Sequence, residues 1–325
     1  MSRMNMAQAL NDALKVEMRR NPDIVLLGED VARLGGVFRV TAGLLEEFGP
    51  DRVLDTPLSE AGIVGSAIGM TLYGLRPVAE IQFADFVYPA FDQIVNELAK
   101  YRYRSGGQFG CPVVVRMPSG GGVKGGLCHS QSPESYFVHT AGLKVVMPSN
   151  PPDAKGLLLS ALRDPDPVIF FEPKSIYRKE TVDVPPDDFT VPLGKAATVL
   201  EGSDVTLIAY GSMIPLAVRS AARALAEGIH VEVVDVRTLL PLDIGHIAAS
   251  IAKTNRAVIL HEAPRTCGYG AELMAQIMER CFWDLDAPLV RVTGFDTPLS
   301  YALEDDYMPT ESRVLRAIRS TLELR

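Results

Sequence analysis

The feature that most constrains this fold is the alternation of short apolar runs with segments of helical periodicity. At the start of the chain, Met6, Leu10, Leu14 and Met18 recur every four residues, as on one face of a helix. Apolar runs typical of buried strands follow, separated by further helical segments. The predicted strands are 24–27, 53–54, 77–83, 111–117, 143–147 and 167–172, and the predicted helices are 61–70, 84–98 and 152–162. Strands that alternate with helices predict an α/β fold with a mostly parallel sheet.

A second unit of the same kind occupies the C-terminal part of the chain. Its predicted strands are 204–210, 231–236, 257–262 and 289–292, and its predicted helices are 213–227, 270–282 and 311–324. Between the two units the alternation stops, and Pro185, Pro186 and Pro192 stand among acidic residues. We therefore predict two α/β domains, residues 1–180 and 197–325, joined by a linker at 181–196.

Composition argues against several classes of partner. The net charge is −8 and no run of Lys or Arg exceeds three residues, whereas a nucleic-acid partner demands a basic face. No apolar stretch has the length needed to span a bilayer. The four cysteines form no C-x-x-C pair, so neither a zinc site nor a disulfide framework is expected. We expect no nucleic-acid partner and no membrane segment.

A glycine-rich stretch, residues 118–134, stands at the centre of the chain. Five glycines fall between Gly120 and Gly126, directly after a predicted buried strand. Glycine lets the backbone approach a ligand closely, and His129 just beyond the glycines can titrate near neutral pH. The alternative is a mobile surface loop with a solvated histidine, and the spacing alone does not decide between the two.

The glycine spacing does not make a nucleotide-binding motif. Gly120, Gly122 and Gly125 match G-x-G-x-x-G, but Pro133 stands where the helix should open, and no acidic residue closes a second strand about twenty positions on. Lys124 lacks the Ser or Thr of a P-loop, and no Gly-x-Ser-x-Gly elbow occurs. The chain therefore has no phosphate-binding motif of its own.

Two acidic residues stand at positions that suit ligand binding. Glu29 follows the strand at 24–27, and ligands of α/β sheets bind outside the carboxyl ends of strands. Glu60 falls in the first turn of the helix at 61–70, where the macrodipole favours a carboxylate. Turn chemistry alone could explain Glu29, and helix capping alone could explain Glu60.

Several motifs together carry a family resemblance that covers essentially the whole chain. They are Asp55-Thr-Pro-Leu-Ser-Glu60, Glu80-Ile-Gln-Phe-Ala-Asp-Phe86, His129-Ser-Gln-Ser-Pro-Glu134, Arg237-Thr-Leu-Leu-Pro-Leu-Asp243 and Gly294-Phe-Asp-Thr-Pro298. The chain resembles the β subunit of the thiamine-diphosphate-dependent, decarboxylating component of 2-oxo acid dehydrogenase complexes. The resemblance implies a thiamine-diphosphate pyrimidine-binding domain followed by a transketolase C-terminal-type domain. It also implies an α2β2 heterotetramer with an α subunit, and a lipoyl acyltransferase as a further partner.

The resemblance assigns roles to individual residues. Glu60 would face the aminopyrimidine of thiamine diphosphate and share a proton with it, and Glu29 would belong to a proton path between two active sites. Phe86 would stack on the aminopyrimidine, with Gln82 and Leu58 lining the same pocket. His129 would act near the substrate and the lipoyl group, oriented by Ser130 and Gln131. The glycine loop would approach the cofactor and the partner chain.

The resemblance also implies ions. In the family a Gly-Asp-Gly motif of the α subunit holds the diphosphate and magnesium, and this chain contains no such motif. Some relatives bind potassium in the β subunit, which here would lie near Val113, Ala161, Asp164 and Asp166. Here the matching positions include Val114 and Asp166, which is a departure from the family.

The substrate is expected to be a branched-chain 2-oxo acid of the 3-methyl-2-oxobutanoate type, because the segments 129–134 and 170–174 look more like branched-chain than pyruvate enzymes. The alternatives are pyruvate or acetoin as substrate, and a non-catalytic scaffold subunit. Transketolase-type transfer by a single chain is disfavoured because 325 residues leave no room for a diphosphate domain. We expect a bacterial cytoplasmic protein, or a mitochondrial matrix protein if the chain is processed.

Overall fold

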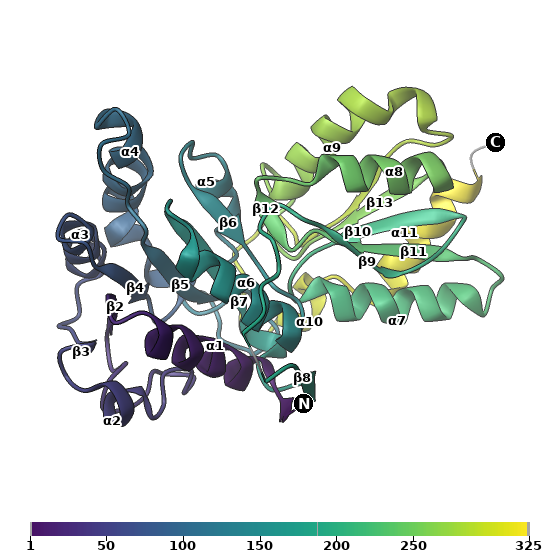
Figure 1. The fold of residues 1–325 in the computed structure, drawn as a ribbon. Coiled ribbons are helices and arrows are strands. Elements are labelled where there is room, and N and C mark those ends of the chain that lie inside the picture. Colours follow the sequence, from purple (N-terminus) through teal and green to yellow (C-terminus); the bar gives the residue numbers. More distant parts are fainter. Residues whose placement is uncertain (1, 187, 324–325) are drawn as a thin grey trace.

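The computed structural model describes residues 2–186 and 188–323. Two large sheets stand side by side, the N-terminal one on the left and the C-terminal one on the right in Figure 1. A small ribbon of β1 (Ser2–Met4) and β8 (Val182–Val184) ties the start of the chain to the segment after the first domain. The predicted α/β architecture with mostly parallel sheets is confirmed in both halves.

Seven strands form the first sheet, in the order β12-β6-β7-β5-β4-β2-β3. Their bounds are β2 (Ile24–Gly28), β3 (Val53–Asp55), β4 (Arg76–Glu80), β5 (Val114–Ser119), β6 (Lys144–Val146), β7 (Val168–Pro173) and β12 (Thr238–Leu240). Every pair is parallel except β12 with β6. β2, β5 and β7 are buried along their whole length, as in a parallel sheet covered on both faces.

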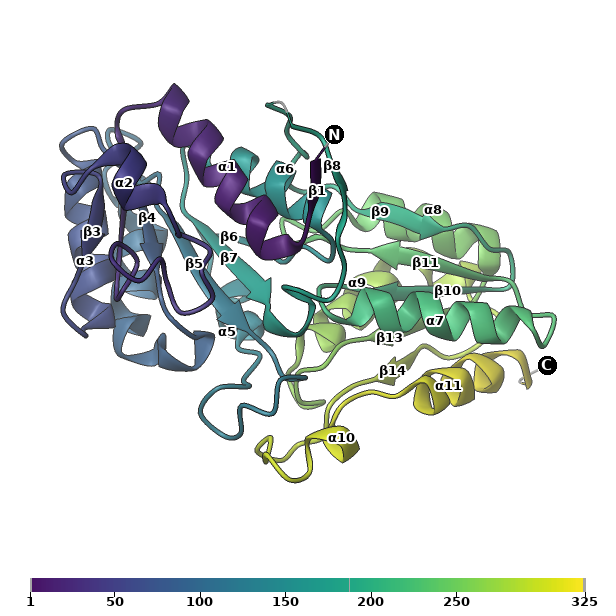
Figure 2. The ribbon, with the colours of Figure 1, turned by 90° about the horizontal axis from the view of Figure 1, so that it is seen from below.

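Helices cover both faces of this sheet. α1 (Met6–Arg20) packs against α6 (Pro151–Arg163) on one face, as Figure 2 shows. The predicted periodicity of α1 is confirmed, since its four apolar residues at four-residue intervals are all buried. The other face carries α3 (Glu60–Thr71), α4 (Tyr101–Arg104) and α5 (Glu134–Val138), while the short α2 (Leu44–Phe48) lies beside β3.

The predicted helix 84–98 is wrong in detail. The chain there forms a succession of short turns, Ala84–Phe86, Tyr88–Ala90, Gln93–Glu97 and Leu98–Lys100, before α4. Pro89 lacks a backbone N–H and cannot continue a regular ladder, which accounts for the irregular start. The turn Ala84–Phe86 holds its side chains at the carboxyl end of β4.

The second sheet has five strands in the order β14-β13-β10-β11-β9. They are β9 (Ala197–Leu200), β10 (Val205–Ala209), β11 (Val231–Asp235), β13 (Ala257–Leu260) and β14 (Val290–Val292), and only β9 runs antiparallel to its neighbour. Helices α7 (Met213–Leu225) and α11 (Glu311–Glu323) cover one face, α8 (Ile244–Thr254) and α9 (Tyr269–Cys281) the other, and α10 (Glu304–Tyr307) is a single turn. The sequence did not predict α4, α5, α8, α10, β1, β8, β9 or β12.

The two halves share structure across their boundary. β12 belongs to the C-terminal half by sequence, yet it pairs with β6 and forms the edge of the first sheet. One buried cluster also runs through both halves, with Phe137 and Phe171 from the first and Tyr210 and Val236 from the second. Among helices of the described ranges, none combines the length and apolarity that crossing a bilayer requires.

Candidate active site

The carboxyl ends of three adjacent strands bring most of the sequence-predicted residues to one edge of the first sheet. Glu29 follows β2, Gln82 follows β4, and the glycine loop with His129 follows β5. Because these strands are parallel neighbours, their carboxyl ends open on the same edge, where ligands of α/β sheets bind.

Glu60 and Glu29 form an acidic pair at this edge. Ser59 caps α3 by accepting a hydrogen bond from the backbone N–H of Gly62, which places Glu60 in the first helical turn with 8% of its surface exposed. Burial raises the pKa of the Glu29 carboxyl, and the charges of Glu60 and Asp30 raise it further. The two acids are therefore close enough for the charge of one to affect the proton of the other.

Aromatic rings hold the imidazole of His129. The ring of Phe83 lies 4.6 Å from it and that of Phe86 5.3 Å, centroid to centroid, both edge to face. Phe83 and Phe86 also contact each other at 5.4 Å. The structure thus brings His129 against Phe86, although the two are 43 positions apart in the sequence.

Gln82 and Leu58 complete the set of predicted cofactor contacts. The side-chain amide of Gln82 donates to the carboxylate of Asp30, the residue after Glu29, at 3.4 Å. Leu58 is 79% exposed, an unusual state for a leucine on a segment that leads into a buried helix turn. This edge is therefore an open apolar and acidic surface.

The glycine loop lies against the second domain of the same chain. A Cβ on Gly120 would overlap Oε1 of Glu262, and one on Gly121 would lie 2.9 Å from the side chain of Leu299. The backbone N–H of Lys124 donates to Glu304 at 2.8 Å. The sequence predicted approach to a cofactor and a partner chain, whereas the close approaches of these two glycines are to this chain's own second domain.

A buried ion cluster that the sequence did not predict lies under the site. Arg116 of β5 donates to Glu80 of β4 at 2.7 Å and to Glu172 of β7 at 2.7 Å, and all three side chains are buried. Burial alone would lower the pKa of Arg116, but Glu172 and Glu80 outweigh it and raise that pKa. Burial raises the pKa of the Glu80 carboxyl. An arginine in an otherwise apolar strand, beside strands that end in glutamate, was the signal for this cluster.

The residues expected near potassium lie elsewhere and do not fit a cation. Val113 precedes β5 at the amino edge of the sheet, and its carbonyl accepts from Val168. The carbonyl of Ala161 accepts from the N–H of Asp164. The guanidinium of Arg76 donates to the carbonyls of Leu162 and Asp164 at 2.8 and 2.7 Å.

Further cations surround the two aspartates of the same turn. Lys144 donates to the Asp164 carboxylate at 2.6 Å, and Arg102 pairs with Asp166. Within residues 2–186 and 188–323 there is no group of three or more His, Cys, Asp and Glu side chains able to hold a metal. Since the turn at 161–166 is already neutralised by side chains, the expectation of a potassium ion there is not supported.

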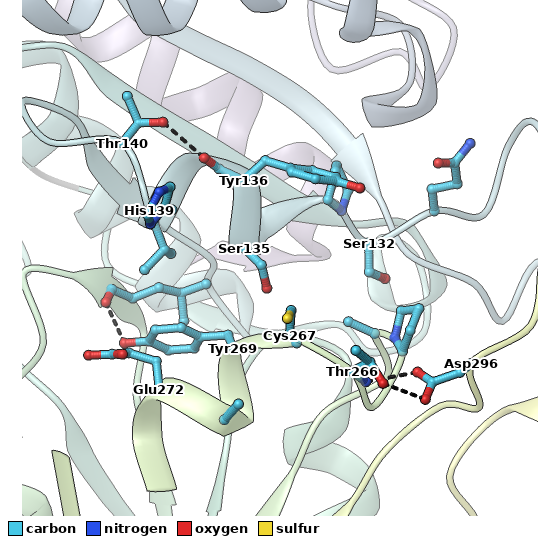
Figure 3. Close-up of a pocket in the computed structure, with 18 of the residues that line it drawn as sticks. Ser132, Ser135, Tyr136, His139, Thr140, Thr266, Cys267, Tyr269, Glu272 and Asp296 are labelled. Carbon is cyan, nitrogen blue, oxygen red and sulfur yellow. Dashed lines mark hydrogen bonds between the residues drawn. The ribbon is translucent and has the colours of Figure 1, made fainter. Parts of the chain in front are cut away.

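A large cavity lies beside the predicted site. It has a volume of about 1620 Å³ and opens at the junction of the two domains. In Figure 3, Tyr136 and His139 of the first domain face Cys267 and Glu272 of the second across it. Ser130 and Gln131 line its wall, but Glu29, Glu60, Phe86 and His129 do not, so the cavity is separate from the edge that carries the acids.

Comparison with known protein families finds two matches that span the two halves. The model described as "Transketolase, pyrimidine binding domain" matches residues 2–180, and the one described as "Transketolase, C-terminal domain" matches residues 194–314. Among solved structures, "Split gene transketolase, inactive beta4 tetramer" is similar with a TM-score of 0.81 over 99% of both chains. Its sequence is 24% identical, so this likeness concerns the fold.

Curated relatives match over nearly the full chain. The "2-oxoisovalerate dehydrogenase subunit beta 2, mitochondrial" of Arabidopsis thaliana is 52% identical, covering 98% of this chain and 89% of its own length. The "2-oxoisovalerate dehydrogenase subunit beta" of Pseudomonas aeruginosa is 49% identical, covering 99% and 95%. The "Pyruvate dehydrogenase E1 component subunit beta" of Staphylococcus epidermidis is 45% identical, covering 99% and 100%.

Proposed function

The chain belongs to the family of 2-oxoisovalerate dehydrogenase β subunits, and on that premise we propose that it acts with a separate α subunit in the oxidative decarboxylation of branched-chain 2-oxo acids. The acyl group would pass to the lipoyl group of an acyltransferase component. The observation that carries the proposal is the convergence of Glu29, Glu60, Phe86 and His129 at one open edge of a sheet. Each of these residues has a role in the proposed reaction.

Thiamine diphosphate, when bound, supplies the nucleophilic carbon and the electron sink that decarboxylation needs. Glu60 would hold a proton at the pyrimidine nitrogen, a role that suits a carboxylate almost withdrawn from water. Glu29 would store or pass a proton beside it, since its raised pKa favours the protonated form.

Phe86, Gln82 and Leu58 would bind the pyrimidine. Phe86 offers an aromatic face at the site edge, worth about 0.5–1.5 kcal/mol beyond its buried area in a stacked contact. Gln82 can donate or accept a hydrogen bond, and Leu58 would lose its exposure when a ring and a partner chain cover it. Apolar cover also excludes water from the reacting atoms.

His129 would serve the acyl transfer. Its imidazole is partly exposed and is held by Phe83 and Phe86, so it can accept or donate a proton at the mouth of the site. Ser130 and Gln131 follow it directly and would fix its direction through the backbone.

The α subunit would complete the site in an α2β2 assembly. The chain carries no Gly-Asp-Gly motif, and the exposed Leu58 lies on a surface that the α subunit would cover. The diphosphate and magnesium would therefore be held by the α subunit. Relatives named as mitochondrial and relatives from bacteria both match, so the bacterial cytoplasm and the mitochondrial matrix both stay as proposed compartments.

The test is a comparison of substrates with the assembled enzyme. This chain would be co-expressed with its α partner and supplied with thiamine diphosphate and magnesium, and kcat/KM would be measured for 3-methyl-2-oxobutanoate and pyruvate with an artificial electron acceptor. A clear preference for the branched acid supports the proposal. A preference for pyruvate keeps the mechanism and overturns the substrate, while activity on neither favours a non-catalytic scaffold subunit.

A further inference from the structure

Asp85 contacts the loop of His129 and has no role in the proposed reaction. It lies in the turn Ala84–Phe86 between the two rings that hold the imidazole, and only 7% of its surface is exposed. Its Oδ1 atom accepts hydrogen bonds from the backbone N–H groups of Ser130 and Gln131, both at 3.0 Å. These two amides follow His129 directly in the chain, so the carboxylate fixes the backbone on which the imidazole stands.

Lys174 lies within electrostatic range of this carboxylate, although no hydrogen bond or ion pair joins the two among the described residues. It is 4% exposed, and its Nζ atom makes no hydrogen bond within the described part of the chain. Burial lowers the pKa of the Lys174 amine to about 8, while Asp85, Glu262 and Glu304 act against that fall. The charges of these three acids thus favour the protonated form of the amine.

The same lysine also contacts the aromatic side of the site. Its Nζ atom lies 5.6 Å from the centroid of the Phe83 ring, and that ring lies edge to face on the imidazole. Lys174 therefore contacts the histidine's surroundings through the ring of Phe83.

We propose that Asp85 is a positioning residue for His129: its carboxylate binds the Ser130 and Gln131 amides and so fixes the imidazole between Phe83 and the acyl-transfer site. The proposal rests on the proposed role of His129. Asp85 acts through the backbone and has no contact with substrate in this account. Misplacement of a reacting group by about 1 Å can cost about 100-fold in rate, so a residue of this kind affects turnover without taking part in the chemistry.

Hydrogen–deuterium exchange tests the clamp without reference to activity. In the assembled enzyme, Asp85→Ala should raise exchange in a peptide spanning residues 127–133, and Asp85→Asn, which keeps an acceptor oxygen, should raise it less. Asp235→Asn is the matched control, because Asp235 is a fully buried aspartate that also accepts from a backbone N–H, in the second sheet. Unchanged exchange in Asp85→Ala would overturn the proposal.

A double-mutant cycle on kcat separates this inference from the proposed function. Asp85→Ala should lower kcat by about 10- to 100-fold in the wild-type background and have almost no further effect in a His129→Ala background. Additive losses would mean that Asp85 acts independently of His129 and would overturn the positioning role. A His129→Ala variant with full acyl transfer to lipoyl would instead overturn the role proposed for His129 itself.

Discussion

Glu60 owes its place to a cap and a helix turn, so its role can be tested by a change that preserves both. Glu60→Gln keeps the shape of the side chain and removes its ability to hold a proton in exchange with a ring nitrogen. In the assembled enzyme we expect kcat to fall by about 10²–10⁴, the usual scale for a positioned acid–base group. Glu46→Gln is the control, since Glu46 also lies in the first turn of a helix but is exposed. Full activity of Glu60→Gln would contradict the assignment.

Glu134 predicts a pH dependence of stability. Burial raises the pKa of its carboxyl to about 7, although a hydrogen bond from Tyr210 to this carboxylate opposes the shift. The folded chain therefore keeps a proton that the unfolded chain releases near the ordinary glutamate value, and the stability gained is present at low pH and lost as pH rises through 7.

A glutamine at this position does not titrate, so the difference between variant and wild type isolates Glu134 from other buried groups. Relative to wild type, Glu134→Gln should gain on the order of 2 kcal/mol of unfolding free energy between pH 5 and pH 8. Urea unfolding at several pH values measures this difference. A difference that stays constant with pH would show that Glu134 titrates normally in the folded chain.

At the scale of elements, the guanidinium of Arg76 takes the place of a bound cation at the turn 161–166. Arg76 reaches two carbonyls of this turn from a position 86 and 88 residues away. We expect the melting temperature of the wild-type chain to be the same in potassium and in choline salts. Arg76→Ala should lose about 1–3 kcal/mol of stability and regain part of it in potassium, because an unpartnered carbonyl cluster suits a monovalent cation.

Arg52→Ala is the matched control for this experiment. Arg52 also donates to two backbone carbonyls, those of Ile24 and Asn21, at 3.0 and 2.8 Å. It should lose stability to a similar degree without any recovery in potassium. A selective rise of the wild-type melting temperature in potassium would restore the ion that the family resemblance implied.

Gly120 connects the glycine loop to the second domain. Its φ of +80° is a left-handed conformation that costs an alanine about 1–2 kcal/mol, and a Cβ there would also collide with Glu262. Gly107 has a φ of +83° but no atom within 4 Å of a Cβ, so Gly107→Ala measures the conformational cost alone. Gly120→Ala should therefore unfold at a lower denaturant concentration than Gly107→Ala. Equal midpoints would mean that the close approach of Gly120 to Glu262 contributes nothing to stability.

Many of the helices and strands could be predicted, because a local pattern of apolar residues decides each of them. The buried runs of β2, β5 and β7 and the periodic face of α1 follow from side-chain hydrophobicity alone. β12 could not be predicted, since a strand of three residues forms there through pairing with β6, far back in the sequence. Pro89 lies inside the predicted helix 84–98. Its missing backbone N–H indicated an irregular helix, but the prediction gave more weight to the apolar periodicity.

At the scale of the whole molecule, the site residues that the sequence could place are those that follow the end of a strand, as Glu29 and Gln82 do. The clamp of Asp85 on Ser130 and Gln131 could not be foreseen, because it depends on the path of a loop backbone. The approach of Gly120 to Glu262 had no sequence signal, since it depends on how the two domains pack.

The open edge also makes a prediction about the isolated chain. Without the α subunit, nothing in this sequence supplies the phosphate-binding motif, and Leu58 remains in water. Isothermal titration with thiamine diphosphate and magnesium should show no tight stoichiometric binding, whereas the co-expressed assembly should bind. Tight binding by the chain alone would falsify the proposed division of labour between the subunits.

The shared strand β12 has a consequence for synthesis. While the chain emerges from the ribosome, the N-terminal sheet presents β6 as an unpaired edge until Leu240 has followed. An exposed edge strand with buried valines is a template for pairing with another nascent copy. A cell that translates this message slowly between the codons of Val146 and Thr238 would lengthen the time at risk, and a fragment that ends in the linker would never leave that state.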